Sequence, residues 1–368
     1  MIYLDNGATS FRKPPAVYRA VQRAMATCAN PGRGGYAAAR RAADAVYGCR
    51  EEAGQLFDCL PEQVVLTNNC THGLNLAIHS CVKPGSSVVI SGFEHNAVTR
   101  PLHALGAVLS VAGKKLFDWE DTLADFERKL DGADAAVFTH VSNVFGYILP
   151  VEAMAKMCRD RGIPFVIDGA QSAGILPVSL RDLGADFIAM PGHKGLLGPQ
   201  GTGLLLCRAG AEPLLYGGTG SDSLRQTMPE ELPDRLEPGT LNVPGYAGLR
   251  EGLRYVRNAT PEKLLAREQG LLKRCVRGLE KAGMQVFSGE HQAAAVSFRA
   301  GLGCEETAAL LARRGITVRA GFHCAPRAHE SAGTLETGTV RVSVGYDTFE
   351  EEITTFIGAA WKLPPYSL

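Results

Sequence analysis

A single lysine lies between glycines in the stretch Met190-Pro191-Gly192-His193-Lys194-Gly195-Leu196-Leu197-Gly198-Pro199. The apolar run at residues 187–190 that leads into it is typical of a buried strand. The glycines and prolines require a sharp turn, and they let another group approach the backbone closely. A lysine on such a tight, partly buried loop loses solvation, which favours its neutral amine and suits Schiff-base chemistry. Taken alone, the segment is explained equally well as a surface loop with a solvated lysine.

The strand that precedes this loop in the chain ends in an acid. It reads Pro164-Phe165-Val166-Ile167-Asp168 and is followed by a glycine turn. A carboxylate at the end of a parallel strand points into the crevice where α/β folds bind ligands. Pyridoxal phosphate needs such a carboxylate against its ring nitrogen, because the protonated ring is an electron sink. An aspartate in this position is otherwise a helix cap or turn residue, but Asp168 and Lys194, 26 positions apart (194 − 168), together favour a pyridoxal phosphate site.

These two segments are similar to those of the class V aminotransferase group, and the chain resembles the fold-type I pyridoxal phosphate enzymes. Within the group it is similar to the cysteine desulfurases and selenocysteine lyases. The similarity runs from Tyr3-Leu4-Asp5-Asn6-Gly7-Ala8-Thr9 to Arg341-Val342-Ser343. The resemblance implies an α/β fold with a large cofactor-binding domain at residues 15–245. Residues 1–14 and 246–368 would then form a smaller α+β domain.

The order of sequence patterns agrees with that division. Apolar runs alternate with helical patterns through the first part of the chain, which indicates a mostly parallel sheet with crossover helices. The expected strands are 64–66, 87–90, 135–138, 165–167, 187–189 and 204–206, and the expected helices are 37–57, 121–129 and 151–161. After Gly239 we expect helices at 245–258 and 261–282 and strands near 294–298, 316–318 and 340–344.

Composition excludes several classes of partner. The 368 residues include 38 Lys and Arg against 38 Asp and Glu, so no nucleic acid or other polyanion is expected as a partner. No apolar run reaches membrane-spanning length and no basic-plus-apolar leader is present, so we expect a cytoplasmic protein without membrane contact. The ten cysteines form no C-x-x-C pair, which argues against a metal site. Most are expected to be buried free thiols, as in reduced cytosol.

A candidate phosphate cradle follows the strand at 64–66, in Thr67-Asn68-Asn69-Cys70-Thr71-His72-Gly73. The segment opens a helix, so its unpaired amides and the positive end of the helix dipole would face an anion. An ordinary helix N-cap at Asn69 or Thr71 is the alternative. The resemblance assigns cofactor contacts to Cys70, Thr71 and His72, although His72 stands where relatives carry an acid.

Two further phosphate contacts are implied by the resemblance. His193 matches a phosphate-side ligand, and Thr240 matches a residue that reaches the phosphate from the second subunit of a homodimer. Pro191 stands where relatives carry a serine, and it offers neither a hydroxyl nor an amide proton. Thr240 is therefore expected to carry more of the phosphate binding.

Three residues match ring contacts of the family. His95, in Phe93-Glu94-His95-Asn96, follows a strand end, where its imidazole would stack on the cofactor ring and take part in catalysis. A lone histidine in this place is otherwise a structural hydrogen bonder. Gln171 and Asn143 match residues that hydrogen-bond the ring hydroxyl and its surroundings.

One cysteine stands apart from the others, in Val318-Arg319-Ala320-Gly321-Phe322-His323-Cys324-Ala325. The segment resembles the cysteine loop of group II desulfurases. A thiol flanked by Arg319 and His323 on a glycine-hinged loop should have more thiolate character than a buried one, and the thiolate attacks sulfur. A buried packing cysteine is the alternative. Cys324 precedes Arg341 by only 17 residues (341 − 324), whereas group I enzymes have a longer loop.

The substrate carboxylate is expected at arginine. Arg341 lies in an alternating strand, where an inward guanidinium is costly unless a carboxylate pairs with it. An outward, solvated arginine is the alternative. The resemblance assigns substrate contacts to Arg341, Arg319 and Asn143, and it places the loop with Arg33 and Tyr36 beside the site without a chemical role.

The resulting hypothesis is a pyridoxal 5'-phosphate-dependent cysteine desulfurase with Lys194, Cys324 and His95 as its catalytic residues. L-cysteine would give L-alanine and a persulfide on Cys324, which passes its sulfur to an acceptor protein that the sequence does not identify. L-selenocysteine is the alternative substrate. Another class V aminotransferase or lyase would not need Cys324, and a non-catalytic sulfur carrier would not need Lys194.

Overall fold

A computed structural model describes residues 1–32, 34–221 and 223–367, and it is built around a seven-stranded sheet. Strands β3 to β7 run parallel, whereas β8 is antiparallel to both of its neighbours. In spatial order the strands are β2 (Val64–Thr67), β8 (Gly203–Cys207), β7 (Phe187–Pro191), β6 (Phe165–Asp168), β5 (Ala135–Thr139), β3 (Ser87–Ser91) and β4 (Val108–Ala112). The mostly parallel sheet predicted from the sequence is confirmed.

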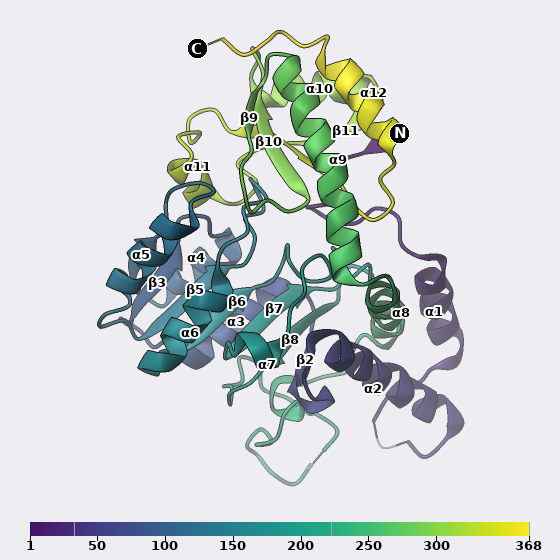
Figure 1. Cartoon of the computed structure of the whole chain (residues 1–368). Helices are drawn as coiled ribbons and strands as arrows, with labels where there is room; N and C mark the ends of the chain where they lie inside the picture. The colour runs from purple at the N-terminus through teal and green to yellow at the C-terminus, as the bar shows by residue number, and fades with distance from the viewer. Residues whose placement is uncertain (33, 222, 368) are drawn as a thin grey trace.

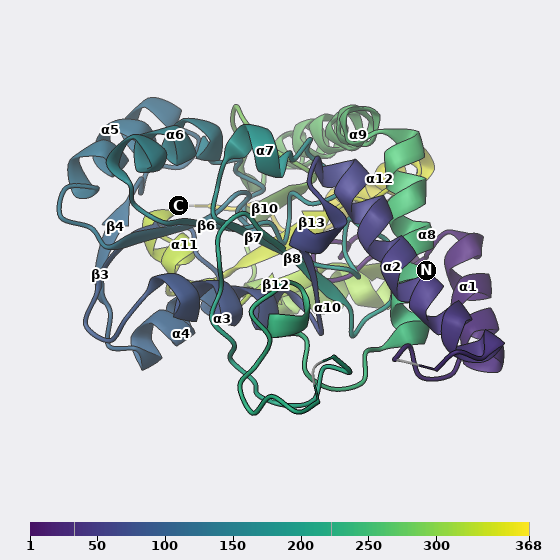
Figure 2. The same ribbon diagram turned by 90° about the horizontal axis from the view of Figure 1, so that it is seen from below.

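Helices cover both faces of this sheet (Figures 1 and 2). Successive side chains of a strand point to opposite faces, and the central strands bury both. In β5, Phe138 belongs to the core shared with the helices of one face, and Val137 to the core of the other. The helices are α5 (Trp119–Lys129), α6 (Val151–Arg161) and α7 (Leu180–Leu183) on the first face, and α3 (Cys70–Cys81) and α4 (Asn96–Ala104) on the second.

Three helices pack together beside the sheet: α1 (Pro15–Thr27), α2 (Ala37–Phe57) and α8 (Val243–Ala259). Helix α8 packs against both α1 and α2, and its side chains Val243, Tyr246 and Leu249 belong to the same core as α2. The helix contains residue 245, the expected end of the large domain, and that boundary stays a prediction.

A second, antiparallel sheet lies above the first in Figure 1. Its order is β12 (Arg319–Gly321), β13 (Thr339–Ser343), β10 (Ala295–Arg299) and β9 (Gln285–Phe287). Around it lie α9 (Pro261–Lys281), α10 (Cys304–Arg313), α11 (Pro326–Ser331) and α12 (Glu350–Ala360). The N-terminal strand β1 (Ile2–Tyr3) pairs in parallel with β11 (Ile316–Thr317), so the start of the chain joins this part of the molecule.

The helices predicted from periodicity are present, with bounds shifted by at most two residues, and the predicted strands are present too. Strands β1, β4, β9 and β12 were not expected, and β1 is only two residues long. β4 is an edge strand with Val108 exposed, and β9 and β12 are three residues long and only partly buried, so none of them carries a strong apolar signal. No helix among the described residues is long and apolar enough to cross a membrane.

Candidate active site

Lys194 lies on a tight loop directly after β7, and its side chain is partly buried. Two glycines make the loop possible. A Cβ on Gly195 would lie 2.3 Å from the carbonyl oxygen of Ala173, and a Cβ on Gly174 would lie 2.4 Å from the carbonyl oxygen of Gly195. Burial lowers the pKa of Lys194, while the nearby Cys70 and Asp168 oppose that shift. The sequence-based expectation of a desolvated lysine, rather than a solvated one, agrees with this geometry.

Asp168 ends β6 and is 2% exposed. Its Oδ1 accepts a hydrogen bond from the Ala170 amide at 2.9 Å and another from the Cys70 thiol at 3.4 Å. Burial and the neighbouring carboxylate raise the pKa of Cys70 well above its usual value, so the thiol keeps its proton and donates. Cys70 therefore orients Asp168.

One cavity brings most of the predicted cofactor residues together. It is lined by side chains from β-strand ends and from the start of α3, and the lining includes Asn69, Cys70, Thr71, His95, Asn143, Asp168, Gln171, His193 and Lys194. Asn69 caps α3 by accepting from the His72 amide at 2.9 Å. The amides of the first helical turn have no partner within the helix, so the cavity meets a helix N-terminus suited to an anion.

Two predicted cofactor residues lie away from this cavity. His72 is not part of its lining, and its Nδ1 accepts from the Asn68 amide at 3.4 Å. Thr240 lines a separate groove together with Tyr47, Arg50 and Glu237. Within one chain, the residues assigned to the cofactor from the sequence therefore line this one cavity, except for His72 and Thr240.

His95 lines the cavity and also caps a helix. Its Nδ1 accepts from the Ala97 amide at 3.0 Å, which directs the other ring nitrogen away from α4. Burial lowers the pKa of His95. The preceding residue, Glu94, is fully buried and accepts from the Thr139 amide at 2.8 Å, which ties the ends of β3 and β5 together beneath His95. Burial raises the pKa of Glu94 to about 8, so this acid is neutral at pH 7.

The N-terminal segment wraps over the lysine loop. The Thr9 hydroxyl contacts His193 Nδ1 at 2.9 Å, and Lys13 Nζ donates to the His193 carbonyl oxygen at 2.8 Å. Gln171 Nε2 donates to the Gly7 carbonyl oxygen at 2.9 Å. Burial lowers the pKa of His193 to about 4 and that of Lys13 to about 8. The N-terminal segment thus packs against the lysine loop and Gln171 beside the cavity.

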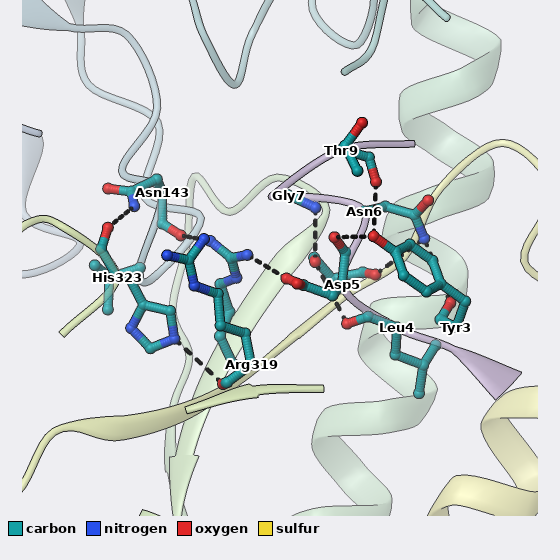
Figure 3. A network of polar contacts seen from close by, with 12 residues as sticks. Tyr3, Leu4, Asp5, Asn6, Gly7, Thr9, Asn143, Arg319 and His323 are labelled. Atoms are coloured by element: carbon teal, nitrogen blue, oxygen red, sulfur yellow. Dashed lines mark hydrogen bonds and ion pairs between the residues drawn. The ribbon is translucent and has the colours of Figure 1, made fainter. Parts of the chain in front are cut away.

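Cys324 is exposed, unlike Cys49, Cys70, Cys158, Cys207 and Cys275. The loop is held in a left-handed backbone conformation, with φ of 52° at His323 and 56° at Cys324. Two contacts fix it: Asn143 Nδ2 donates to the His323 carbonyl oxygen at 2.7 Å, and the Asn96 amide donates to the Cys324 carbonyl oxygen at 2.8 Å (Figure 3 shows the first). Since Asn143 also lines the cavity, the cysteine loop begins at the cavity edge.

The expected effect of His323 on the Cys324 thiol stays a prediction. His323 is 3% exposed, and burial together with Arg341 lowers the pKa of its imidazole to about 3. Its Nε2 faces the Arg319 carbonyl oxygen at 3.3 Å, and the ring stacks on His329 with centroids 5.8 Å apart. Any cationic support for the thiolate would have to come from an arginine.

Arg341 is 1% exposed and faces inward, as predicted. Its Nη2 forms an ion pair with Asp5 Oδ1 at 2.5 Å, and its Nη1 donates to the Asn143 carbonyl oxygen at 2.8 Å. The Nε atom has no partner among the described residues. Arg319 lies on β12 opposite Arg341 in the register, so the two guanidinium-bearing residues are cross-strand neighbours. Tyr36 is exposed, and Arg33 lies outside the described residues.

Comparison with known proteins places this geometry in a family. The family model described as aminotransferase class-V matches residues 2–356. The chain belongs to the class-V aminotransferase family. A probable cysteine desulfurase of Pyrococcus abyssi is 32% identical, and the alignment covers 99% of this chain and 94% of that protein.

Solved structures agree with the family assignment. The apo structure of a cysteine desulfurase from Thermococcus onnurineus superposes with a TM-score of 0.91 at 32% identity, covering 98% of this chain and 94% of that one. A cysteine desulfurase from Escherichia coli with an S-sulfonic acid gives a TM-score of 0.85 at 26% identity, covering 97% and 93%. The fold-type I architecture predicted from the sequence is therefore confirmed.

The residues around this class-V cavity fit pyridoxal 5'-phosphate chemically. A buried carboxylate, a partly buried lysine and a helix N-terminus meet the needs of a ring nitrogen, an aldehyde and a phosphate. The Asn143 Oδ1 atom is buried without a partner among the described residues and is free for a donor at the cavity.

Sequence reasoning missed several residues of the site: Asp5, Lys13 and Glu94. Their signals were weak, because each is a single charged residue beside an apolar or glycine-rich segment. Asp5 contacts β13, and Lys13 contacts the lysine loop. These partners lie 336 and 180 positions away in the sequence. Glu94 directly precedes His95 in the sequence, and it is buried just after the end of β3.

Proposed function

We propose that this class-V protein is a pyridoxal 5'-phosphate-dependent cysteine desulfurase that converts L-cysteine to L-alanine and holds the released sulfur as a persulfide on Cys324. The observation that carries the proposal is the double role of Asn143. It lines the cavity with Lys194 and Asp168, and it hydrogen-bonds the loop that presents Cys324.

The cavity residues divide the work on the cofactor. Lys194 would hold it covalently, Asp168 would face its ring nitrogen, and the first turn of α3 would face its phosphate. Bound there, the cofactor supplies an electron sink for a bond broken at the substrate Cα. His95 is suited to cover the ring because one of its nitrogens is occupied by the Ala97 amide.

The substrate carboxylate would bind at Arg341 and Arg319. Arg341 is held by Asp5 and Asn143, so the guanidinium cannot swing with its ligand. Burial lowers the pKa of Lys194, so its neutral amine would be suited to take the Cα proton.

Sulfur transfer then needs the exposed thiol. The Cys324 thiolate attacks the substrate sulfur, an S–S bond forms as the C–S bond breaks, and the electron pair leaves with the carbon fragment. That fragment takes up a proton and is released as alanine. An acceptor thiol of a partner protein removes the sulfur from Cys324, which its exposure allows. We expect this chemistry in the reducing cytoplasm.

We also propose a homodimer. The segment between β8 and α8 exposes large apolar side chains, with Leu215 at 53%, Tyr216 at 77% and Leu224 at 95%. Thr240 ends the same segment and lies away from its own chain's cavity. A second copy that covers these side chains would bring its own Thr240 to the neighbouring phosphate.

Replacement of Cys324 by Ala tests the proposal. The variant should bind cofactor normally, with an unchanged visible spectrum, yet lose at least about 100-fold of the alanine formed from L-cysteine, a loss that corresponds to nearly 3 kcal/mol in the transition state. Cys28→Ala is the matched control, since Cys28 is also partly accessible but lies at the end of α1.

The choice of substrate separates the alternatives. If Cys324→Ala keeps its activity on L-selenocysteine and loses it on L-cysteine, the thiol serves sulfur chemistry specifically. If the variant releases sulfur from L-cysteine at the wild-type rate, the protein is another class-V lyase and the persulfide is not part of its reaction.

A further inference from the structure

A second cavity lies against the lysine loop, on the inner side of the site. It shares Val141, Ala170, Gln171 and Lys194 with the cofactor cavity, so these four residues form the wall between the two. Its other walls come from the N-terminal segment, from the start of α9 and from the residues after β13. Most of the lining is apolar, and it includes Ile175, Leu197, Leu264 and Ala293.

Glu268 is the acid of this inner cavity. The residue lies on α9 and is 1% exposed. Both of its carboxyl oxygens are buried and have no partner among the described residues. A buried ionised carboxylate without a partner is strongly disfavoured, so the group must be neutral or must bind something in the cavity.

Burial favours the neutral form of Glu268, whereas the positive charge of Arg267 favours the ionised form. Arg267 is its neighbour in sequence but turns away and donates to the Gly345 carbonyl oxygen at 3.3 Å. Asp347, from the segment after β13, is an acid and opposes ionisation, and Arg12 is its ion-pair partner at 3.8 Å. Burial raises the pKa of Glu268 to about 8.

Among the described residues, two other ionisable side chains line the inner cavity, namely Lys194 and Tyr346. Burial also lowers the pKa of Lys194, so the lysine and Glu268 are both pushed toward their uncharged forms. The cavity has about 50 Å³ of space open to water-sized molecules. One water needs on the order of 10–15 Å³, so a short chain of waters fits, and Asn6 Oδ1, a buried acceptor without a partner among the described residues, adds a contact for it.

We propose that the inner cavity is a hydrated compartment in which Glu268, as a neutral carboxylic acid, exchanges a proton with Lys194 through water. The proton of Glu268 passes to a water as that water passes one to the lysine amine, which leaves a carboxylate and an ammonium. The reverse transfer restores two neutral groups, and no further reactant is needed. Glu268 thus acts on the reaction only through Lys194, and the inference rests on the proposed role of that lysine.

Infrared spectroscopy of the apoprotein tests the protonation of Glu268. At pH 7 the wild type minus Glu268→Gln difference spectrum should contain the C=O stretching band of one neutral carboxylic acid, and the wild-type band should fade above pH 8. The subtraction removes the bands expected from other buried acids, such as Glu94. Glu262→Gln, at an exposed position on the same helix, should show no such band. If the band is absent from the Glu268 difference spectrum, or if potassium or sodium removes it, Glu268 is an ionised cation ligand and the proposal is overturned.

A second measurement tests the coupling to Lys194. Carbamylation of Lys194 by cyanate, followed by peptide mass spectrometry across pH, reports the neutral amine in the apoprotein. Above pH 8 an ionised Glu268 would hold the lysine in its charged form, so Glu268→Gln should react about threefold faster there, the change in neutral fraction that a half-unit pKa shift gives. Identical pH profiles in wild type and Glu268→Gln would overturn the proposal. Alanine formation and the Cys324→Ala result are scored separately, so failure here leaves the proposed function standing.

Discussion

The ion pair between Asp5 and Arg341 should hold the N-terminal segment onto β13, and Asp5→Asn tests this. The guanidinium is 1% exposed and the Asp5 side chain is 17% exposed, with 2.5 Å between Nη2 and Oδ1. Removing one partner of a buried pair costs about 3–5 kcal/mol, because a charge is left buried without its counter-charge. Asn retains an acceptor oxygen and Asp5 is partly hydrated, so we expect a loss at or below the bottom of that range, about 2–3 kcal/mol.

Urea unfolding of the apoprotein at fixed protein concentration measures the loss, with reversibility checked by dilution. Asp131→Asn is the control, because Asp131 is exposed in the turn between α5 and β5 and its replacement should change stability by less than about 0.5 kcal/mol. The same Asp5→Asn change is then made in an Arg341→Met background. There it should cost less than about 1 kcal/mol, since the charge that Asp5 neutralised is gone.

Two results would refute the reasoning. A loss below about 1 kcal/mol for Asp5→Asn alone would mean that Arg341 finds its counter-charge elsewhere. An equal loss in the wild-type and Arg341→Met backgrounds would mean that Asp5 acts through its backbone turn rather than through the guanidinium.

Three further outcomes follow from the site. Lys194→Ala should lose the visible band of the bound cofactor and any borohydride-fixed label, and a label that persists elsewhere would disprove the lysine assignment. Thr240→Ala should weaken cofactor binding by roughly 1.5–3 kcal/mol, the value of a hydrogen bond to a charged group, in a protein that sediments as a dimer; an unchanged affinity or an active monomer would contradict the shared site. The pKa of Glu94 is about 8 in the folded protein against an ordinary 4.5. At pH values between these two, the folded state holds one more proton than the unfolded state, so the free energy of unfolding falls as the pH rises. The free energy of unfolding, measured by urea titration, should fall from pH 5 to pH 8, and this fall should be smaller by roughly 2–4 kcal/mol in Glu94→Gln than in the wild type. An equal fall in both proteins would exclude this account.

The cysteine loop shows how far local sequence can be read. The glycine, histidine and cysteine pattern identified Cys324 as different from the other thiols, and the structure exposes it. The protonation of the neighbouring His323 could not be predicted from this pattern, because its burial beside His329 and the nearby charge of Arg341 depend on β13 and α11 packing around it. Protonation in a folded protein is set by the neighbours in space, which adjacent residues in the sequence do not reveal.

The sequence by itself determined the elements and the chemistry of their ends. Runs such as Phe165–Asp168 and Phe187–Pro191 are apolar enough to be buried on both faces, so they read as central strands, and the polar residue that follows each strand reads as part of the site. Tertiary structure alone decided which distant residues complete that site. Asp5, Lys13 and Glu268 are charged side chains without a local pattern, and each acquires its role from the partner or the burial that the fold gives it. Periodicity records which face of an element is buried, whereas pairing and desolvation of single charges depend on long-range packing that no short stretch of sequence contains.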